Sequence, residues 1–283
     1  MIGGPLLFTA PHSAKLKRGH PDVYGESVRT HLREKYTACL SMKLACMLAD
    51  KKKSAPGSYC VWSSSHKFND TDLDPNYLLA GGVAESPFHR MLHAWALGNQ
   101  GKPLMHIDIH GKMDRKDTYE LDLGVQPFYK HFAPHGEQDF IDSFVGSLTE
   151  GFDRALAPLE KYKSFKASCQ NDPVLHGLWG GDLRTMTEQA CELGIPSFQL
   201  EIPLTMRRAL FSDDRLLSAL LDAILLTYEN VVTPWWAART TPLRVSDKLS
   251  HSLTLLVEPL PEVKKRLGRY CEWEKKQVKE KVI

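Results

Sequence analysis

The stretch from residue 104 to residue 111 constrains the fold of this chain more than any other. Ile107 and Ile109 alternate with polar residues as in a buried β-strand, and glycine and proline on either side mark its ends. Asp108 and His110 therefore lie in or beside the core. Buried carboxylates and imidazoles are costly unless they are paired, hydrogen-bonded or bound to a metal. The stretch predicts either a metal ligand at His110 or a satisfied core histidine beside a capped aspartate.

Three predicted strands carry an ionisable group near the carboxyl end. His12 follows a strand that ends near Phe8, His110 ends the central strand, and Glu201 lies near the end of a later one. Open α/β sheets bind ligands at the carboxyl ends of their strands. The three groups are therefore expected to lie close together, although they are far apart in the sequence.

Strand patterns alternate with helical patterns along the chain, which favours the α/β class. We expect a three-layer αβα fold with a mixed, mostly parallel central sheet. The chain is expected to form a single domain over 1–283, with a C-terminal helical extension at about 259–283. The expected strands are 6–9, 59–62, 104–110, 117–125 and 195–203, and the expected helices are 31–50, 86–97, 137–157, 185–193, 212–230 and 261–281. Residues 15–30 are expected to form a loop.

Charge and composition limit the classes of partner. With 36 basic and 34 acidic residues the net charge is +2, so no long-range attraction to nucleic acid is built in. No apolar stretch is expected to approach the roughly 20 residues that span a bilayer, and the N-terminus lacks the features of a signal peptide. The six cysteines form no C-x-x-C pair, which favours reduced thiols and a cytoplasmic protein. A small-molecule substrate is the expected partner, and the oligomeric state stays open.

The spacing of acidic residues and histidines predicts a metal site with two histidines and one carboxylate. His12 and His110 supply the imidazoles, and Glu34, in the first turn of the helix expected from residue 31, supplies the carboxylate. Catalytic zinc sites of this kind keep a coordination position open for water. Glu201 is then the general base, and Asp108 orients a ligand histidine. Two alternatives stay open: Glu34 favoured only by the helix dipole, and Glu201 as a salt-bridge partner.

Several motifs, taken in order, resemble those of the N-formylglutamate amidohydrolases, relatives of the zinc carboxypeptidases. The resemblance rests on residues 11–14 (PHSA), 34–37 (EKYT), 108–111 (DIHG), the glycine pair 180–181 and residues 198–202 (FQLEI). Each motif is short, and their order carries the resemblance. It implies a phosphorylase/hydrolase-like αβα fold and hydrolysis of a carbon–nitrogen amide bond by a metal-activated water. It also implies His12 and His110 as metal ligands, Glu34 as the third ligand and Glu201 as the base.

The chain departs from the family pattern at two places. The carboxypeptidase glutamate three residues after the first ligand histidine is replaced by Lys15, and the family's Asn-Arg after the second strand is replaced by the acidic stretch 69–73. An arginine there would help to neutralise a substrate carboxylate, so the substrate need not be N-formylglutamate itself. The candidate substrate-binding residues are Asn69, Asp70, Gly180, Gly181, Arg207 and Arg208; the two arginines suit an anionic substrate end.

These features lead to one main hypothesis and two alternatives. The chain is expected to be a hydrolase that uses Zn²⁺, or another divalent metal, to cleave the amide bond of an N-acyl amino acid or peptide-like substrate. The first alternative is an interaction protein that keeps the fold and has lost the reaction. The second is a zinc carboxypeptidase that acts on a protein tail.

Overall fold

The structure is a computed structural model of the whole chain. It describes residues 4–18, 29–52, 57–62, 74–115, 119–169, 177, 182–239, 242–245 and 260–279. The substrate-binding candidates Asn69, Asp70, Gly180 and Gly181 lie outside these ranges.

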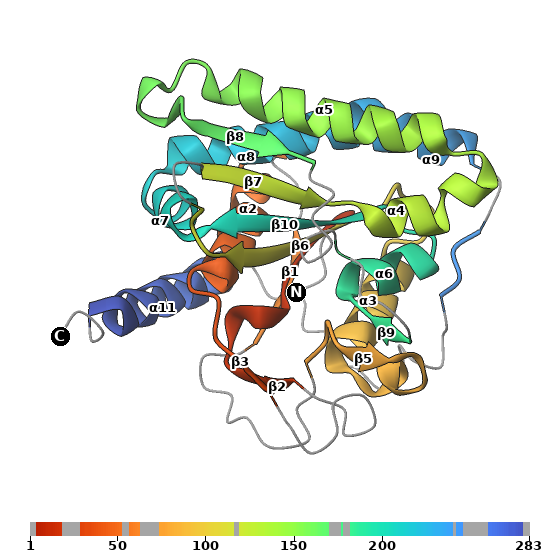
Figure 1. Ribbon diagram of the computed structural model, residues 1–283, viewed down its shortest axis with the longest axis horizontal. Coiled ribbons are helices and arrows are strands. Elements are labelled where there is room, and N and C mark those ends of the chain that lie inside the picture. Colours follow the sequence, from red (N-terminus) through yellow and green to blue (C-terminus); the bar gives the residue numbers. More distant parts are fainter. Residues whose placement is uncertain are drawn as a thin grey trace.

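A six-stranded sheet forms the middle layer (Figure 1). Its strands, in spatial order, are β4 (Ser58–Val61), β1 (Leu6–Ala10), β6 (Met105–Lys112), β10 (Ser197–Pro203), β7 (Tyr119–Gly124) and β8 (Phe165–Ser168). The first four are mutually parallel, β7 runs antiparallel to β10, and β8 is parallel to β7. The expected mixed, mostly parallel sheet is confirmed.

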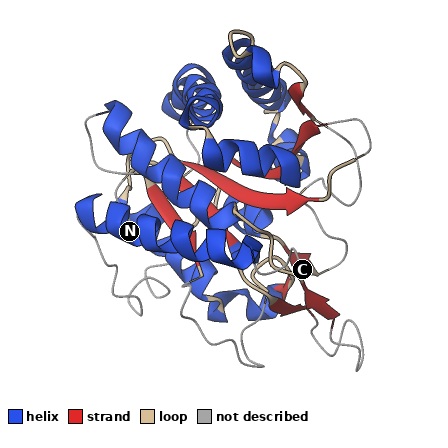
Figure 2. Cartoon of the chain, turned by 90° about the vertical axis from the view of Figure 1, so that its left-hand side faces the viewer, coloured by secondary structure: helices blue, strands red, loops and turns tan. Residues whose placement is uncertain are grey.

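Helices cover both faces of the sheet, as the two views show (Figures 1 and 2). The helices are α2 (Thr37–Lys52), α3 (Pro87–Gly98), α4 (Gln126–His131), α5 (Gln138–Leu156), α6 (Met186–Glu192), α7 (Leu204–Ser212), α8 (Asp214–Thr227), α9 (Thr233–Ala238) and α11 (Leu260–Lys279). One core joins Phe8, Ile107 and Ile109 to α2, α5 and α8, and a smaller core joins Leu7 to α3 and α6. The three-layer αβα prediction is therefore confirmed.

The two cores explain why the polar side chains of β6 lie together. Successive side chains of a strand point to opposite faces of the sheet. Ile107 and Ile109 enter the larger core, so His106, Asp108 and His110 face the side of the smaller core. All three are almost fully buried there.

The helix predicted from residue 31 begins later, at Thr37. Residues Arg29–His31 form strand β3, which pairs antiparallel with β2 (Leu16–Arg18), so the ends of the predicted loop 15–30 are strands. Tyr36 has a positive φ of 71°, which an L-residue rarely adopts and which cannot continue a helix. Glu34 therefore lies in an irregular segment before α2, and its expected place in a helical first turn is wrong.

A continuous helical run from Asp214 to Ala238 is longer and more apolar than the sequence analysis expects. It covers 25 residues and contains an 18-residue window with a mean hydropathy of 1.4. By length and composition alone it is long and apolar enough to cross a membrane. The expectation that no stretch approaches that length is wrong. Just over half of that window, 56%, is buried inside the structure, and α8 packs along α5. These contacts are those of a core helix.

Candidate metal centre at the carboxyl ends of the parallel strands

The sheet register brings the predicted site residues to one edge. His12 lies in a short 3-10 helix, Pro11–Ser13, directly after β1. On the next strands His110 and Glu201 are register partners, so their side chains leave the same face of the sheet side by side. The next two parallel strands along the chain, β4 and β6, lie on opposite sides of β1. Such a topological switch point is where α/β sheets bind ligands.

The Glu34 carboxylate lies between the two predicted ligand histidines. Its Oε1 is 3.0 Å from His12 Nδ1, and its Oε2 is 3.4 Å from His110 Nδ1. The imidazole centroids are 4.6 Å apart. The Gly111 N–H also donates to Oε2, at 2.8 Å, which fixes the carboxylate against β6. The structure thus brings together three groups from segments that lie far apart in the sequence.

Each of the two histidines is held by an aspartate through its other ring nitrogen. His12 Nε2 lies 2.9 and 3.0 Å from the carboxylate oxygens of Asp74, and His110 Nε2 lies 2.8 Å from Asp108 Oδ2. An Nε2–H that donates to a carboxylate leaves Nδ1 with the lone pair of the neutral ring. At His110 the Asn76 amide nitrogen, 2.7 Å from Nε2, competes with Asp108 for that atom. Both Nδ1 atoms then face Glu34. Asp108 contacts His110 on the side of the ring away from Glu34, and its role in orienting a metal ligand stays a prediction.

A third histidine joins this group. His31 Nε2 lies 3.0 Å from Glu34 Oε1, and its ring centroid is 4.0 Å from that of His12. Donor atoms of His12, His31 and Glu34 all lie within 4.8 Å of one another. His31 is not among the site residues predicted from the sequence, because a helix is expected to start at that residue. The signal is present as His31-Leu32-Arg33-Glu34, a histidine and a glutamate at H-x-x-E spacing.

The charges at this centre depend on one another. Burial disfavours protonation of His12, but the carboxylates of Asp74 and Glu34 outweigh it and raise the pKa of the imidazole. For His110 burial acts in the same sense, and Asp108 and Glu34 raise its pKa well above the ordinary value. Burial alone would raise the pKa of Glu34, yet the two histidines hold it well below its usual range. Without another cation, the protein must supply the positive charge from its own imidazoles.

Glu201 lies in a different environment from Glu34. Only 6% of it is exposed, and burial raises its pKa to about 7, against the opposing effect of His110. The Gln199 amide donates to its Oε1. A carboxyl group with a pKa near 7 can both accept and return a proton at neutral pH.

The acidic loop before α3 supplies two residues that the sequence analysis does not single out. Asp74 orients His12, and the Asn76 side chain donates to Asp108 Oδ2 at 3.3 Å while its own oxygen accepts the Met186 N–H at 2.5 Å. The run 69–76 suits either a capped turn or a loop that belongs to a site. Within the part of this run that the structure describes, Asp74 and Asn76 contact residues of this centre.

The two candidate arginines have different positions. Arg207 is buried and donates to the carbonyl oxygens of Ile202, Lys35 and Lys112 at 3.0, 2.6 and 3.1 Å. Arg208, the next residue on α7, is exposed. Arg207 therefore ties the segment after Glu34 to the ends of β6 and β10, and its role toward a substrate stays a prediction.

The donor set fits a divalent metal ion. Imidazole nitrogens oriented by carboxylates, together with a carboxylate oxygen, are the usual protein ligands of zinc, although other transition metals accept them too. Here Nδ1 of His12, Nδ1 of His110 and Nε2 of His31 all approach Glu34. The centre can therefore hold a metal with two or three imidazoles and one carboxylate.

Comparisons with known proteins assign no function to this chain. No protein-family model matches the chain, and no curated protein matches it in sequence. A solved structure described as "YNDL-apo (Zinc-free)" aligns with a TM-score of 0.39 and 13% sequence identity, over 80% of this chain and 85% of that chain. A likeness at this TM-score carries no argument about function.

Proposed function

We propose that this protein is a metal-dependent hydrolase that cleaves a carbon–nitrogen amide bond, with Zn²⁺ as the metal. The observation that carries the proposal is the pair of aspartate-oriented histidines whose Nδ1 atoms both face Glu34. Carboxylates placed in this way accompany histidines that bind metals. The order of the short motifs, which resembles that of the N-formylglutamate amidohydrolases, supports the same class of reaction.

The mechanism assigns separate tasks to the two glutamates. A bound Zn²⁺ supplies Lewis-acid polarisation of the amide carbonyl and makes water a better nucleophile. Glu34 would serve as a ligand, because its two carboxylate oxygens lie next to the Nδ1 atoms of His12 and His110. Glu201 takes the proton from the attacking water and returns it to the leaving nitrogen. Gln199 holds Glu201 Oε1, so Oε2 is the oxygen that carries the proton.

We expect the substrate to be an N-acyl amino acid or a peptide-like molecule that binds at this edge of the sheet. Lys112, next to the site on β6, is paired with Asp122 of β7. Arg207 already binds three backbone carbonyls. Lys112 and Arg207 could therefore bind an anionic substrate end only through N–H groups that are not used in these contacts. Assays with different N-acyl substrates identify the acyl group.

Metal analysis of the purified protein beside His12→Ala and His110→Ala variants tests the proposal. Dialysed against Zn²⁺ without chelator, each variant is expected to hold about one equivalent less metal than the wild type. Glu150→Gln, which changes an exposed side chain on α5, is the control. Equal metal content in all four proteins would exclude this centre as a metal site.

Turnover of N-acyl amino acids and of a peptide library then separates the hydrolase from its alternatives. Glu201→Gln is expected to keep the metal and lose activity by about 10²–10⁴-fold, the usual effect of removing a general base. Glu150→Gln, an exposed change on α5, is expected to keep both. Metal binding by a wild type that cleaves none of these substrates would favour an interaction protein, and cleavage of peptides only at the C-terminus would favour a carboxypeptidase.

A further inference from the structure

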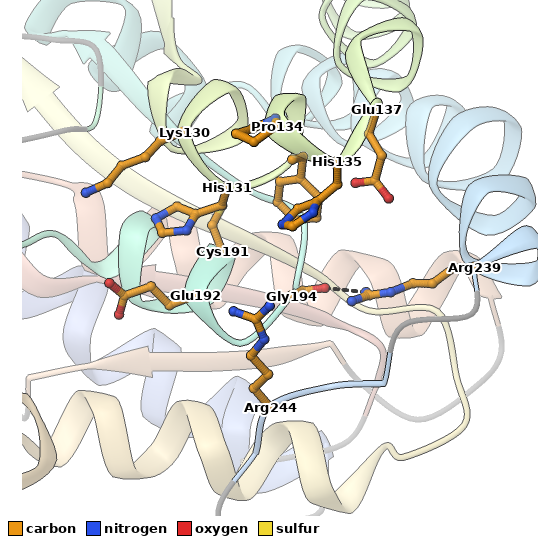
Figure 3. Close-up of a pocket in the computed structure, with 11 residues that line it drawn as sticks. Lys130, His131, Pro134, His135, Glu137, Cys191, Glu192, Gly194, Arg239 and Arg244 are labelled. Carbon is orange, nitrogen blue, oxygen red and sulfur yellow. Dashed lines mark hydrogen bonds between the residues drawn. The ribbon is translucent and has the colours of Figure 1, made fainter.

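A second group of side chains of the types that ligate metals lies away from the Glu34 centre, beside a pocket of about 190 Å³. The pocket is bounded by the end of α4, by the end of α6 and by Arg239 and Arg244 (Figure 3). His131 and Glu192 line it, and their side chains approach each other in the close-up. No step of the proposed reaction uses these residues.

The group consists of His131, Glu188 and Glu192. His131 is the last residue of α4, and the two glutamates are four residues apart on α6, so they share one face of that helix. One donor atom from each lies within 4.8 Å of the others, and His131 Nε2 is 3.9 Å from Glu188 Oε1. Donors on one ion with bonds near 2.1 Å are roughly 3–4 Å apart, so small side-chain shifts would complete a site.

Unsatisfied atoms at the same place point to a missing partner. Glu188 is fully buried, and among the described residues its Oε2 has no hydrogen-bond partner. The buried Nε2 of His131 also has no hydrogen-bond partner there. Buried polar atoms are nearly always bonded, and a missing ion or water is one of the few explanations when they are not.

Two cations of the protein, Lys130 and Arg184, already contact this group, and Arg184 Nε lies 3.8 Å from Glu188 Oε1. Lys130 binds Glu188 Oε1, and Arg184 Nε lies 2.7 Å from Glu192 Oε1. Both contacts use an Oε1 atom, so one oxygen of each glutamate and the histidine nitrogen remain as donors. The Lys130 side chain is 42% exposed and can turn into solvent if a cation takes its place.

We propose that His131, Glu188 and Glu192 bind a divalent transition-metal ion at a site separate from the Glu34 centre. One imidazole nitrogen and two carboxylate oxygens suit Zn²⁺, Mn²⁺ or Co²⁺, whereas Cu⁺ prefers sulfur ligands. The pocket gives the ion access to the site from solvent. Bound there, the ion links the end of α4 to α6.

The test uses the full chain with the Glu34 centre disabled by the double substitution His12→Ala and His110→Ala. In this background Zn²⁺ alone is the probe, and equilibrium dialysis with metal analysis gives affinity and stoichiometry. We expect about one equivalent to remain bound. Adding His131→Ala or Glu192→Gln is expected to weaken binding at least tenfold, whereas Glu137→Gln, on the wall of the same pocket, leaves the affinity unchanged.

Lys130→Met provides a test in the opposite direction, because it removes the competing cation and is expected to tighten Zn²⁺ binding several-fold. Circular dichroism and thermal melting of every variant check that it is folded. Zn²⁺ binding that is the same with and without His131 and Glu192 overturns the proposal. Because the Glu34 centre is already disabled, that failure is separate from any failure of the proposed hydrolase.

Discussion

At the scale of single residues, Glu34 is the group on which the candidate centre depends. It contacts His12, His31 and His110 through its two oxygens, and the Gly111 N–H holds it in place. The positions of His12 and His110 in turn depend on aspartates that do not touch Glu34. The orientations of the His12 and His110 rings are therefore fixed by Asp74 and Asp108.

Replacing Asp74 by alanine is expected to weaken Zn²⁺ binding at the Glu34 centre by about 10–100-fold, because His12 loses the carboxylate that orients its ring. Competition with a chromogenic chelator measures the affinity. Asp142→Ala, which removes an exposed aspartate of α5, is the control. Unchanged affinity in the Asp74 variant would show that His12 needs no such support.

Gly111, in the central motif, has no room for a side chain. A Cβ there would overlap the Arg207 guanidinium, so Gly111→Ala must push this group away from the carbonyls it binds. We expect a loss of about 1–3 kcal/mol in the free energy of unfolding, typical of overpacking. Urea unfolding measures it.

Gly146→Ala is the matched control for that substitution. Gly146 lies inside α5, and a Cβ added there would have no atom within 4 Å, so alanine is expected to stabilise by about 0.5–1 kcal/mol through helix propensity. Two variants of equal stability would contradict the account of Gly111.

At the scale of elements, α3 and α6 form the lid over the polar face of the sheet. His89 of α3 lies 3.1 Å through Nδ1 from Gln189 Oε1 of α6, and His93 Nε2 lies 3.0 Å from His89 Nε2. The Gln189 amide nitrogen donates to the Pro75 carbonyl at 2.9 Å, so its oxygen accepts from His89. Burial between the two helices lowers the pKa of both imidazoles and so favours their neutral forms.

The histidine pair predicts a specific loss of stability in acid. Burial, and then the neighbouring His93, lower the pKa of His89 to about 4 from 6.5. Between these values the unfolded chain binds a proton that the folded chain does not, so the free energy of unfolding falls as the pH falls from 6.5 toward 4. Urea midpoints across this window measure the slope.

His89→Gln keeps an amide donor and does not titrate, so its slope should be smaller than that of the wild type. His135→Gln, at an exposed histidine, should leave the slope as it is. An unchanged slope in the His89 variant would mean that the α3–α6 contact does not contribute to acid sensitivity.

At the scale of the whole molecule, the C-terminal helix α11 supports the site although it lies at the far end of the chain. It packs on α2, and its buried Glu274 binds Arg33 and accepts the Tyr36 N–H at 3.0 Å. The Arg33 guanidinium also lies 4.1 Å over the Trp273 ring. Both Arg33 and Tyr36 flank Glu34, so α11 fixes the segment that carries it.

Glu274→Ala is expected to lower the free energy of unfolding by about 3 kcal/mol, because it leaves a largely buried arginine without its carboxylate. It should also weaken Zn²⁺ binding at the Glu34 centre, since the segment 33–36 loses its anchor. Urea unfolding and metal titration give the two results. Glu272→Ala, which removes a solvent-exposed ion pair with Lys275, is the control and is expected to leave the stability nearly unchanged.

The sequence by itself predicted five of the six strands of the sheet, all except β8, and the residues at its carboxyl edge. Alternating apolar residues predicted β6, and short apolar runs predicted β1 and β10, each with an ionisable group near its carboxyl end. For this reason His12, His110 and Glu201 were expected to meet, and the register brings them to one edge.

Only the tertiary structure decided which partners complete the site. Asp74 reaches it through a contact across 62 residues of sequence, and Arg33 is bound by Glu274, which lies 241 residues away. The backbone turn at Tyr36, with φ of 71°, moves Glu34 out of the expected helix. Such contacts are set by packing between distant segments, which leaves no periodic pattern in the local sequence.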